Sequence, residues 1–469
     1  MSGIPRRKAF GGNRSKAENV SACFHPQSKE QTVHIQIIKQ ARKSGQLNLT
    51  NRGMIEGANL FNALARAAKA NWGLSKEAIA IIYKGAFIPK VTYAAGAWYK
   101  AAEKGSIKRK LRSAQQTALL RMTRAYRTTS TEALMVIAGT TPIDMILREK
   151  AKAYMCRRGY SINIKNETYK GTEYEMQATA MMLPRPYNRM AINIATEEDR
   201  SDIDIYTDGS KVEGQVGASF LVIKDNEEIY QDQFRLDDRC SVYQAELFAI
   251  LQTIRWVIST RLSGSIIINT DSSAAIHTLK QFNDKNMMAL EAKKLIEEYG
   301  LKIKIRWVKA HIGIAGNEKA DTLAKEAASL TETTYNKIPI SYIKRLLRQE
   351  SIDEWQEEWS YSMKGRHTFW LLPNIEERMN DLRWLSSDFI TTQLLTNHCN
   401  TKEYLKRIGK QQDTQCECGK GEHSLDHVIN ECTKYEMERI QLLSLVKGTL
   451  DISSLDLYMI IRARDLVQE

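Results

Sequence analysis

Apolar residues in the central part of the chain fall into short strand-like runs before they take up a helical period. Three runs, at 203–206, 217–223 and 228–234, are separated by turn signals and predict three strands that form a meander. Within 243–259, apolar residues recur every three or four positions, which predicts an amphipathic helix. Three consecutive isoleucines within 265–269 are typical of a central strand that is buried on both faces.

The pattern continues with helices and one more strand. Two helical stretches are predicted at 273–282 and 287–299, a strand at 302–308, and a last helix from about 315 to 330. The order of these elements predicts an α/β layered domain with a mixed five-stranded sheet between helices.

The flanking regions predict helices. Helical patterns occur at 57–71 and 106–127, and the chain becomes helical and aromatic after residue 330. Its later tryptophans are more typical of a core than of base stacking, and they are Trp355, Trp359, Trp370 and Trp384. The predicted organisation is a helical basic region at 29–160, a linker at 161–200, the α/β domain at 201–330, a helical segment at 331–410 and a cysteine-bearing region at 411–469.

Charge is unevenly distributed along the 469 residues. The net charge is +13, of which residues 1–200 carry about +20 and the remainder about −7. The stretch 106–127 is especially basic, through Lys108, Arg109, Lys110, Arg112, Arg121, Arg124 and Arg127. This stretch has two interpretations: a helix face exposed to solvent, or a surface that contacts nucleic-acid phosphates. The second makes RNA or single-stranded nucleic acid a candidate partner of the basic half.

Cysteine usage and hydropathy bear on the compartment. Seven cysteines form no regular framework, which favours a reducing environment. Neither a secretory segment nor an apolar run of about 18 residues stands out. We therefore expect a nuclear or cytoplasmic protein that is neither secreted nor inserted in a membrane.

Four carboxylates occupy ends of the predicted elements. Asp208 lies where a strand runs into a turn, Glu246 near the start of a helix, Asp271 at the end of a strand and Asp321 in the last helix, with His311 ten residues before it. Any one of them could be a turn or helix-end acid. Delivered together to one end of one sheet, they would need metal ions to neutralise them, and Mg²⁺ prefers such oxygen ligands.

These acidic frames, in this order, resemble ribonuclease H of type 1 over about residues 200–330. The resemblance implies cleavage of the RNA strand of an RNA–DNA hybrid with two Mg²⁺ ions, Mn²⁺ being an alternative. It assigns Asp208 to both metals, Glu246 and Asp271 to one, and Asp321 to the other. His311 would move a proton or help product release.

Three residues near these carboxylates are expected to have structural roles. Asn317 and Glu318 are expected to shape the loop before the last helix, and Trp307 is expected to lie in the core. Integrases and transposases also use carboxylate clusters, so a DNA nuclease of the same fold is an alternative. A catalytically inactive nucleic-acid-binding remnant is another.

The basic helical region resembles a second family. Its segments 72–75, 88–93, 125–130 and 138–144 are similar to the thumb-like region that follows the palm in reverse transcriptases of non-long-terminal-repeat retrotransposons. No segment has the aromatic-x-Asp-Asp signature of a polymerase palm, so polymerase activity is not predicted. The chain resembles the carboxy-terminal part of a retrotransposon polyprotein.

The last region holds a set of thiols and imidazoles. Cys416, Cys418, His427 and Cys432 supply three thiols and one imidazole, a closed ligand set for one structural Zn²⁺. The spacing resembles the Cys-x-Cys, His, Cys element at the end of the same retrotransposon proteins. His427 is preferred to His423 because the four-residue gap to Cys432 is then retained. Buried thiols beside a surface histidine are the alternative.

Overall fold

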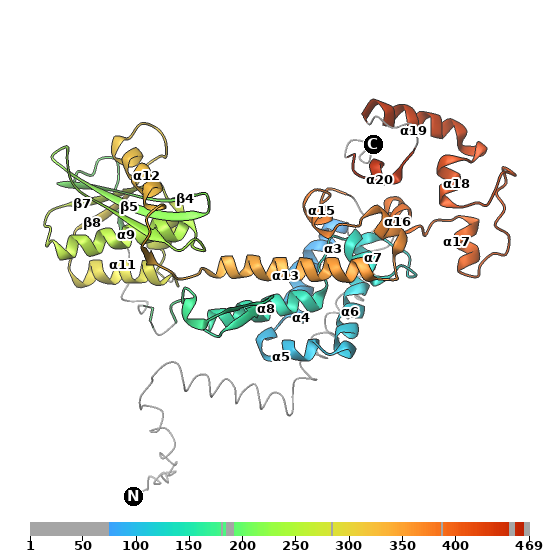
Figure 1. Ribbon diagram of the computed structural model, residues 1–469, viewed down its shortest axis with the longest axis horizontal. Coiled ribbons are helices and arrows are strands. Elements are labelled where there is room, and N and C mark those ends of the chain that lie inside the picture. The colour runs from blue at the N-terminus through green and yellow to red at the C-terminus, as the bar shows by residue number, and fades with distance from the viewer. Residues whose placement is uncertain are drawn as a thin grey trace, which may run out of the picture.

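The computed structural model describes six parts of the chain, which are residues 75–179, 182–183, 192–282, 285–385, 388–449 and 455–463. Figure 1 shows an α/β domain, a helical unit beside it and a smaller carboxy-terminal region on the far side of that unit. The helix predicted at 57–71 lies outside the described residues.

The α/β domain is built on a sheet of seven strands. Its strand order is β3-β8-β7-β4-β5-β6-β9. The five predicted strands are confirmed as β4 (Ile203–Val212), β5 (Gln215–Lys224), β6 (Glu227–Leu236), β7 (Ile266–Thr270) and β8 (Ile303–Trp307). Two short strands extend its edges, β3 (Asn193–Ile194) and β9 (Thr333–Tyr335). The meander β4-β5-β6 is antiparallel, whereas β7 and β8 join it in parallel, so the sheet is mixed.

Four helices follow the sheet strands along the chain and cover the sheet. They are α9 (Val242–Ser259), α10 (Ser273–Lys280), α11 (Met287–Glu298) and α12 (Ala315–Ala327). In Figure 1, α12 lies on one face of the sheet, and α9 and α11 lie on the other. Gly217 lets α12 approach closely, since a Cβ there would lie 2.1 Å from the Ala324 carbonyl oxygen. The Ser219 hydroxyl donates to the Ala320 carbonyl at 2.7 Å and fixes the register of the helix on the sheet.

The helical unit is assembled from two distant parts of the chain. Its first part comprises α3 (Lys76–Ile82), a π-helix (Tyr83–Phe87), α4 (Ile88–Val91), α5 (Ala95–Ala102), α6 (Gly105–Thr123), α7 (Thr131–Ile137) and α8 (Ile143–Arg157). Its second part comprises α13 (Ile340–Tyr361), α14 (Arg366–Leu371), α15 (Ile375–Asn380), α16 (Phe389–Thr396) and α20 (Leu457–Ile460). One hydrophobic core joins them, with Leu111 and Leu134 from the first part and Trp355 and Trp359 from the second, all buried.

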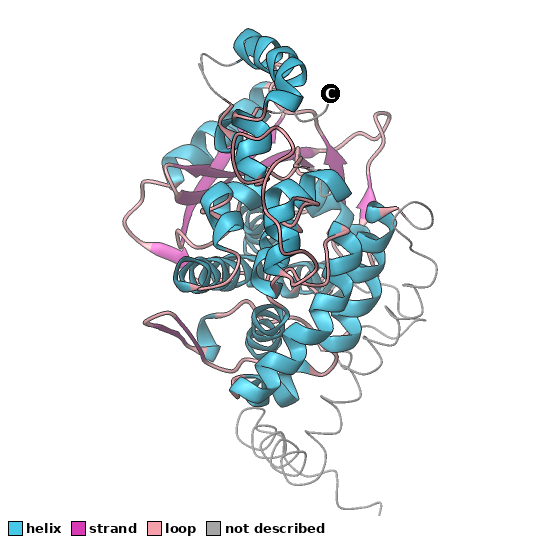
Figure 2. Cartoon of the chain, turned by 90° about the vertical axis from the view of Figure 1, so that its right-hand side faces the viewer, coloured by secondary structure: helices cyan, strands magenta, loops and turns pink. Residues whose placement is uncertain are grey.

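Ion pairs hold the long helix α13 against the first part of the unit, alongside which it runs in Figure 1. Figure 2 shows the molecule from the side, with helices in cyan and strands in magenta. Lys108 Nζ lies 2.5 Å and Arg112 Nη1 2.7 Å from the Glu358 carboxylate. Lys152 Nζ lies 2.8 Å from Glu350. Part of the basic surface predicted on 106–127 is therefore neutralised within the protein.

The tryptophan prediction is confirmed for Trp355 and Trp359, which are buried in the core, and for Trp384, which packs against it; it is wrong for Trp370. Trp370 is 54% exposed and Trp384 is half-buried.

Part of the segment predicted as a linker, at residues 162–175, is structured. It forms a hairpin of β1 (Ile162–Ile164) and β2 (Glu167–Tyr169). Beyond it, residues 173–175 pair with Ile338, whose N–H donates to the Glu173 carbonyl at 2.7 Å and whose carbonyl accepts from the Glu175 N–H at 2.9 Å. We call these two adjacent segments, 173–175 and 337–339, the paired connection. They join the α/β domain to the helical unit at one place.

The carboxy-terminal region contains three further helices, α17 (Lys402–Arg407), α18 (Leu425–Asn430) and α19 (Glu436–Thr449). None of the helices in the described residues is both long enough and apolar enough to span a membrane.

Candidate functional site

Three of the predicted carboxylates meet at one end of the sheet. Asp208 belongs to β4, Glu246 to α9, and Asp271 directly follows β7. One oxygen atom of each lies within 4.8 Å of an oxygen of the others. Asp321, on α12, is outside this group of three, and its Oδ2 accepts a hydrogen bond from Lys325 Nζ at 2.7 Å.

The sequence around each residue explains this convergence. In the parallel pair β4–β7, Thr207 is opposite Thr270, so the next residues, Asp208 within β4 and Asp271 just beyond the end of β7, lie side by side. Glu246 reaches them because α9 packs against β4 at Gly209, where a Cβ would lie 2.5 Å from the Glu246 backbone nitrogen. Gly209 therefore lies inside β4 and not in the turn that the sequence suggested, and it is required because α9 packs closely against the strand there.

The cluster is electrostatically strained without a cation. Burial raises the pKa of Asp208 to about 7, and the charges of Asp271 and Asp321 act in the same direction, while Lys325 opposes them. Burial, followed by the charges of Asp208 and Asp271, raises the pKa of Glu246 well above its usual range. Glu246 Oε2 is also buried with no hydrogen-bond partner in the described part of the chain. These three observations fit a site that holds a divalent cation.

His311 lies apart from the carboxylate group. It is exposed on the loop between β8 and α12, with a backbone φ of +54°. Its side chain makes no hydrogen bond to any residue that the structure describes. The structure thus leaves this imidazole free to meet a substrate or solvent.

Two residues contact Asp271 in a way that the sequence did not predict, Asn317 and Trp307. Asn317 is buried and its Nδ2 lies 3.5 Å from Asp271 Oδ2, so it contacts the carboxylate group as well as shaping a loop. Trp307 is 52% exposed and donates its indole N–H to the Asp271 carbonyl at 3.1 Å. The expectation of a core tryptophan was wrong, because Trp307 ends β8 beside Asp271, where about half of its surface stays exposed. The parallel pairing of Trp307 with Thr270 was the signal that sequence alone did not give.

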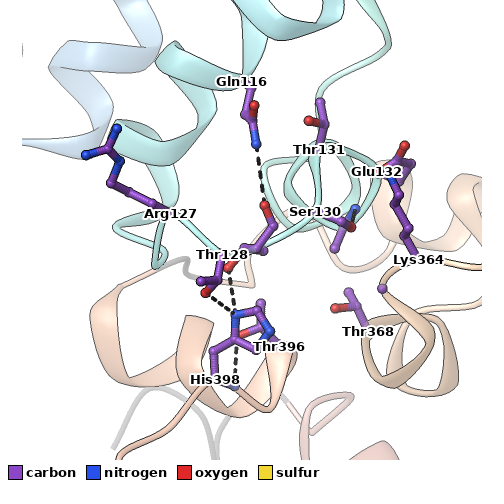
Figure 3. A pocket seen from close by; sticks show the side chains of 13 residues that line it. Gln116, Arg127, Thr128, Ser130, Thr131, Glu132, Lys364, Thr368, Thr396 and His398 are labelled. Atoms are coloured by element: carbon purple, nitrogen blue, oxygen red, sulfur yellow. Dashed lines mark hydrogen bonds between the residues drawn. The ribbon is translucent and has the colours of Figure 1, made fainter. Parts of the chain in front are cut away.

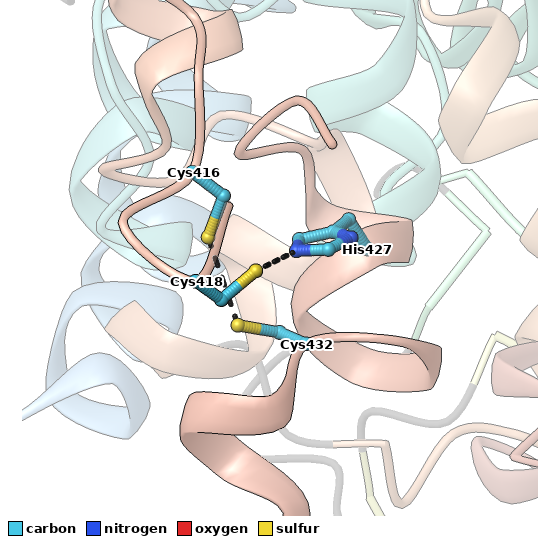
Figure 4. A group of neighbouring side chains, drawn as sticks. All are labelled: Cys416, Cys418, His427 and Cys432. Carbon is cyan, nitrogen blue, oxygen red and sulfur yellow. Dashed lines mark hydrogen bonds between the residues drawn. The ribbon is translucent and has the colours of Figure 1, made fainter. Parts of the chain in front are cut away.

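A second group of metal-ligand atoms lies in the carboxy-terminal region (Figure 4). Cys416 Sγ lies 3.6 Å from Cys432 Sγ, and Cys418 Sγ lies 3.2 Å from His427 Nε2. All four atoms lie within 4.8 Å of one another. Two thiolates bound tetrahedrally to Zn²⁺ at about 2.3 Å lie about 3.8 Å apart, so the arrangement fits zinc.

Neighbouring groups orient these ligands. The other ring nitrogen of His427, Nδ1, lies 3.2 Å from Glu431 Oε2, which leaves Nε2 facing the thiols, the arrangement that a metal-bound histidine usually has. The backbone N–H of Lys420 donates to Cys418 Sγ at 3.4 Å, and it is the main cause that lowers the pKa of Cys418 to about 6. A thiol that ionises near neutrality is a good metal ligand.

His423 is occupied elsewhere. Its Nδ1 accepts a hydrogen bond from the backbone N–H of Lys402, at the start of α17, at 3.1 Å. The structure therefore places His427, and not His423, with the three thiols. Cys432 follows the end of α18, and its N–H donates to the His427 carbonyl at 2.7 Å, which brings the two ligands together across the helix end.

Comparison with known proteins defines the class. The RNase H family matches residues 200–329. A protein named ribonuclease H from Campylobacter jejuni is 30% identical over 135 residues, which are 27% of this chain and 90% of that protein. Through this segment the chain belongs to the ribonuclease H family, which confirms the resemblance and the α/β fold.

Other relatives narrow the identification. Two are named "Retrovirus-related Pol polyprotein from type-1 retrotransposable element R1", with the number 4 added in the first case. The relative from Nasonia vitripennis is 42% identical over 105 residues, covering 22% of this chain and 26% of that protein. The relative from Popillia japonica is 29% identical over 214 residues, covering 44% of this chain and 81% of that protein. The chain is thus a homologue of the Pol polyproteins of R1 non-long-terminal-repeat retrotransposons, and it spans about a quarter of the Nasonia relative.

Proposed function

We propose that residues 200–329 form a metal-dependent endonuclease that hydrolyses the RNA strand of an RNA–DNA hybrid. The observation that supports this most directly is the group of Asp208, Glu246 and Asp271 in a ribonuclease H fold. Asp208 and Glu246 are buried with raised pKa values, and one oxygen of Glu246 has no hydrogen-bond partner among the described residues. A structural role alone does not account for it, because three converging carboxylates destabilise a folded domain unless a cation neutralises them.

These carboxylates would hold the first Mg²⁺ or Mn²⁺, and Asp321 with Asp208 would hold the second. When bound there, such ions would supply activation of a water molecule and stabilisation of the leaving 3′ oxygen. Asn317 would keep Asp271 in its orientation through the contact at Oδ2. His311, on its exposed loop, would exchange a proton with solvent or product.

The test is cleavage of three labelled substrates in Mg²⁺: an RNA–DNA hybrid, an RNA duplex and a DNA duplex. We expect cleavage of the RNA strand of the hybrid alone. Asp271→Asn should abolish it, since the amide keeps the shape and loses the charge. The matched control Asp225→Asn, in the exposed β5–β6 turn, should leave the rate unchanged.

Three outcomes would contradict the proposal. Most of the activity remaining in Asp271→Asn would remove the assigned site. Cleavage of the DNA duplex would favour the DNA nuclease. Tight hybrid binding with no cleavage in either Mg²⁺ or Mn²⁺ would identify the inactive remnant.

We also propose that Cys416, Cys418, His427 and Cys432 bind one structural zinc ion. The ligand distances and the Glu431 contact to His427 support this assignment. Such an ion would stabilise a region with little apolar core of its own, since binding free energy at a structural zinc site contributes to folding.

A further inference from the structure

A polar cavity of about 560 Å³ opens in the helical unit, away from the carboxylate group. It lies between the α6–α7 loop, the start of α14 and the end of α16 (Figure 3). Its lining includes Gln116, Arg127, Ser130, Lys364 and His398. None of these residues belongs to either metal-ligand group.

Two cations border this cavity without a partner of their own. Arg127 and Lys364 are both exposed, and in the view of Figure 3 they lie on opposite sides of the cavity. Neither side chain forms an ion pair with a residue in the described ranges. Only one carboxylate, Glu132, lines the cavity with them. This contrasts with Lys108 and Arg112, whose charges are met by Glu358.

Hydrogen bonds hold the wall of the cavity in place. The hydroxyl groups of Thr128 and Thr129 lie 3.2 Å and 3.1 Å from His398 Nδ1 (Figure 3). The Thr128 hydroxyl also lies 2.8 Å from the Tyr404 hydroxyl, and Gln116 Nε2 donates to the Thr129 carbonyl at 3.5 Å. The loop that carries Arg127 is thus fixed to α16 and α17 before any ligand binds, which lowers the entropic cost of binding.

Two partly exposed aromatic rings, those of Tyr126 and Phe389, belong to segments that border the cavity, although neither residue is part of its lining. Tyr126 precedes Arg127 in the chain and is 37% exposed. Its ring lies 5.8 Å from that of Phe389, which is also 37% exposed, and 6.1 Å from that of Tyr404. A basic groove beside accessible aromatic rings is the combination that binds single-stranded nucleic acid, because the cations meet the phosphates and the rings stack on bases.

We propose that this cavity binds single-stranded nucleic acid, with a phosphodiester between Arg127 and Lys364 and a neighbouring base stacked on Tyr126 or Phe389. A duplex is a poorer fit, because its bases are stacked on one another and offer no free face to a ring. The site would be separate from the proposed hybrid-cleaving centre, and it does not depend on that centre being active.

The test is equilibrium binding of the full chain to three fluorescent probes, a 12-nucleotide oligo-dT, a 12-nucleotide oligo-U and a blunt 12-base-pair DNA duplex. Arg127→Gln with Lys364→Gln should weaken binding of both single strands by about tenfold or more. The slope of log affinity against log salt should fall by about 0.7 for each phosphate that the variant no longer neutralises. Tyr126→Leu should weaken single-strand binding by about fivefold or more, the scale of one base–aromatic stacking interaction.

Matched controls remove the same groups elsewhere. Lys104→Gln with Lys110→Gln takes two exposed charges from the first half of α6, about 20 Å or more along the helix from its last residue. Tyr93→Leu removes a tyrosine that is 74% exposed. Both controls should bind the single strands within about twofold of the unaltered protein. All variants should keep the thermal unfolding profile, because the changed side chains are exposed or half-buried.

The result separates the candidate ligands. Similar losses for oligo-dT and oligo-U support a site that recognises phosphate and the face of a base. A loss confined to one of them would overturn this, because the sugar or the C5 methyl group of thymine would then decide binding. Equal weakening by the cavity variant and the lysine control would overturn the proposal in favour of general electrostatic attraction. Equal weakening for the duplex would overturn it in favour of a duplex site. Hybrid cleavage, measured separately, should stay unchanged in the cavity variant, so failure here is distinguishable from failure of the proposed nuclease.

Discussion

Asp208 carries a charge that the fold opposes, and this makes the metal-free domain sensitive to pH. Its pKa in the folded protein is about 7, above the value of about 3.9 for an unperturbed aspartate. A group whose pKa is raised on folding stabilises the folded state at pH values below its pKa in the unfolded chain. This contribution is lost as the pH rises through its pKa in the folded protein. The full effect is at most about 4 kcal/mol.

We therefore predict that the metal-free ribonuclease H domain loses stability between about pH 4 and pH 8, and that Mg²⁺ restores it at the upper end. Amide hydrogen exchange of residues 203–224, corrected for the intrinsic rate, measures this locally. Asp208→Asn should flatten the profile. A metal-free stability that rises across this range would show that the carboxylate group is not strained.

The exposed position of His311 suits assistance with proton transfer rather than metal binding. His311→Ala should slow hybrid cleavage by about 10²-fold without abolishing it, the usual scale of such assistance. His277→Ala, an exposed histidine on α10, is the control and should have no effect. If the rate of the unaltered enzyme does not change between about pH 6 and pH 9, the proton role is wrong.

The zinc ligands can be tested with a control thiol. Cys432→Ser should release one zinc ion per chain, measured by elemental analysis, and make residues 411–432 accessible to protease. Cys399→Ser changes a half-buried thiol outside the ligand group and should retain the zinc. Hybrid cleavage should survive both changes, since no zinc ligand lies in the α/β domain; its loss in Cys432→Ser would show that the two regions are coupled.

Among the elements, the turn from α13 into α14 depends on one glycine. Gly365 has φ +69°, and a Cβ there would lie 2.9 Å from Ala133 Cβ and 3.2 Å from the Trp359 ring. Gly365→Ala should destabilise the helical unit by about 1–3 kcal/mol, because strain and crowding add. Gly105→Ala, at the start of α6 with no atom within 4 Å, is the matched control. Equal unfolding temperatures for the two variants would contradict this account.

The elements that could be predicted from sequence are those with a strong local period. The five main strands and the helices beside them have one, and the acidic frames sit at their ends, so the convergence of Asp208, Glu246 and Asp271 could be anticipated. The strands β3 and β9 could not, because two or three residues carry no period and their partners are distant in sequence.

Contacts between distant segments were likewise not predictable. Basic residues on a helix such as α6 or α8 ordinarily indicate a face exposed to solvent. Only the structure shows that α13 pairs with them, 198 residues later in the chain for Lys152 and 250 residues later for Lys108. The cysteine and histidine set could be predicted because its chemistry is specific, although the choice between His427 and His423 depended on spacing alone.

At the scale of the whole molecule, the α/β domain is inserted into the helical unit. The buried Trp355 and Trp359 share a core with helices that precede residue 157, so a truncation that removes the chain up to about residue 190 would expose that core. Excision of the inserted domain should be tolerated better, because Tyr174 and Ile338 are neighbours in the paired connection.

We predict that replacing residues 176–336 by a short Gly-Ser linker leaves a folded helical unit that binds zinc and single strands but cleaves nothing. Size-exclusion chromatography, circular dichroism and oligo-dT binding would measure this. An aggregated or unfolded product would show that the α/β domain is needed for the helical unit to fold.

The paired connection also constrains motion. A domain on one flexible linker can swivel, whereas a domain held by two hydrogen-bonded segments, with Gln244 of α9 donating to the Lys337 carbonyl at 3.2 Å, can tilt but cannot turn freely about its own axis. The carboxylate group therefore keeps a fixed orientation relative to the helical unit. If the cavity of the helical unit holds a single-stranded overhang of a hybrid, the duplex part would reach the carboxylate group with one fixed strand polarity. The arrangement of the protein would then decide which end of the RNA strand is cut first.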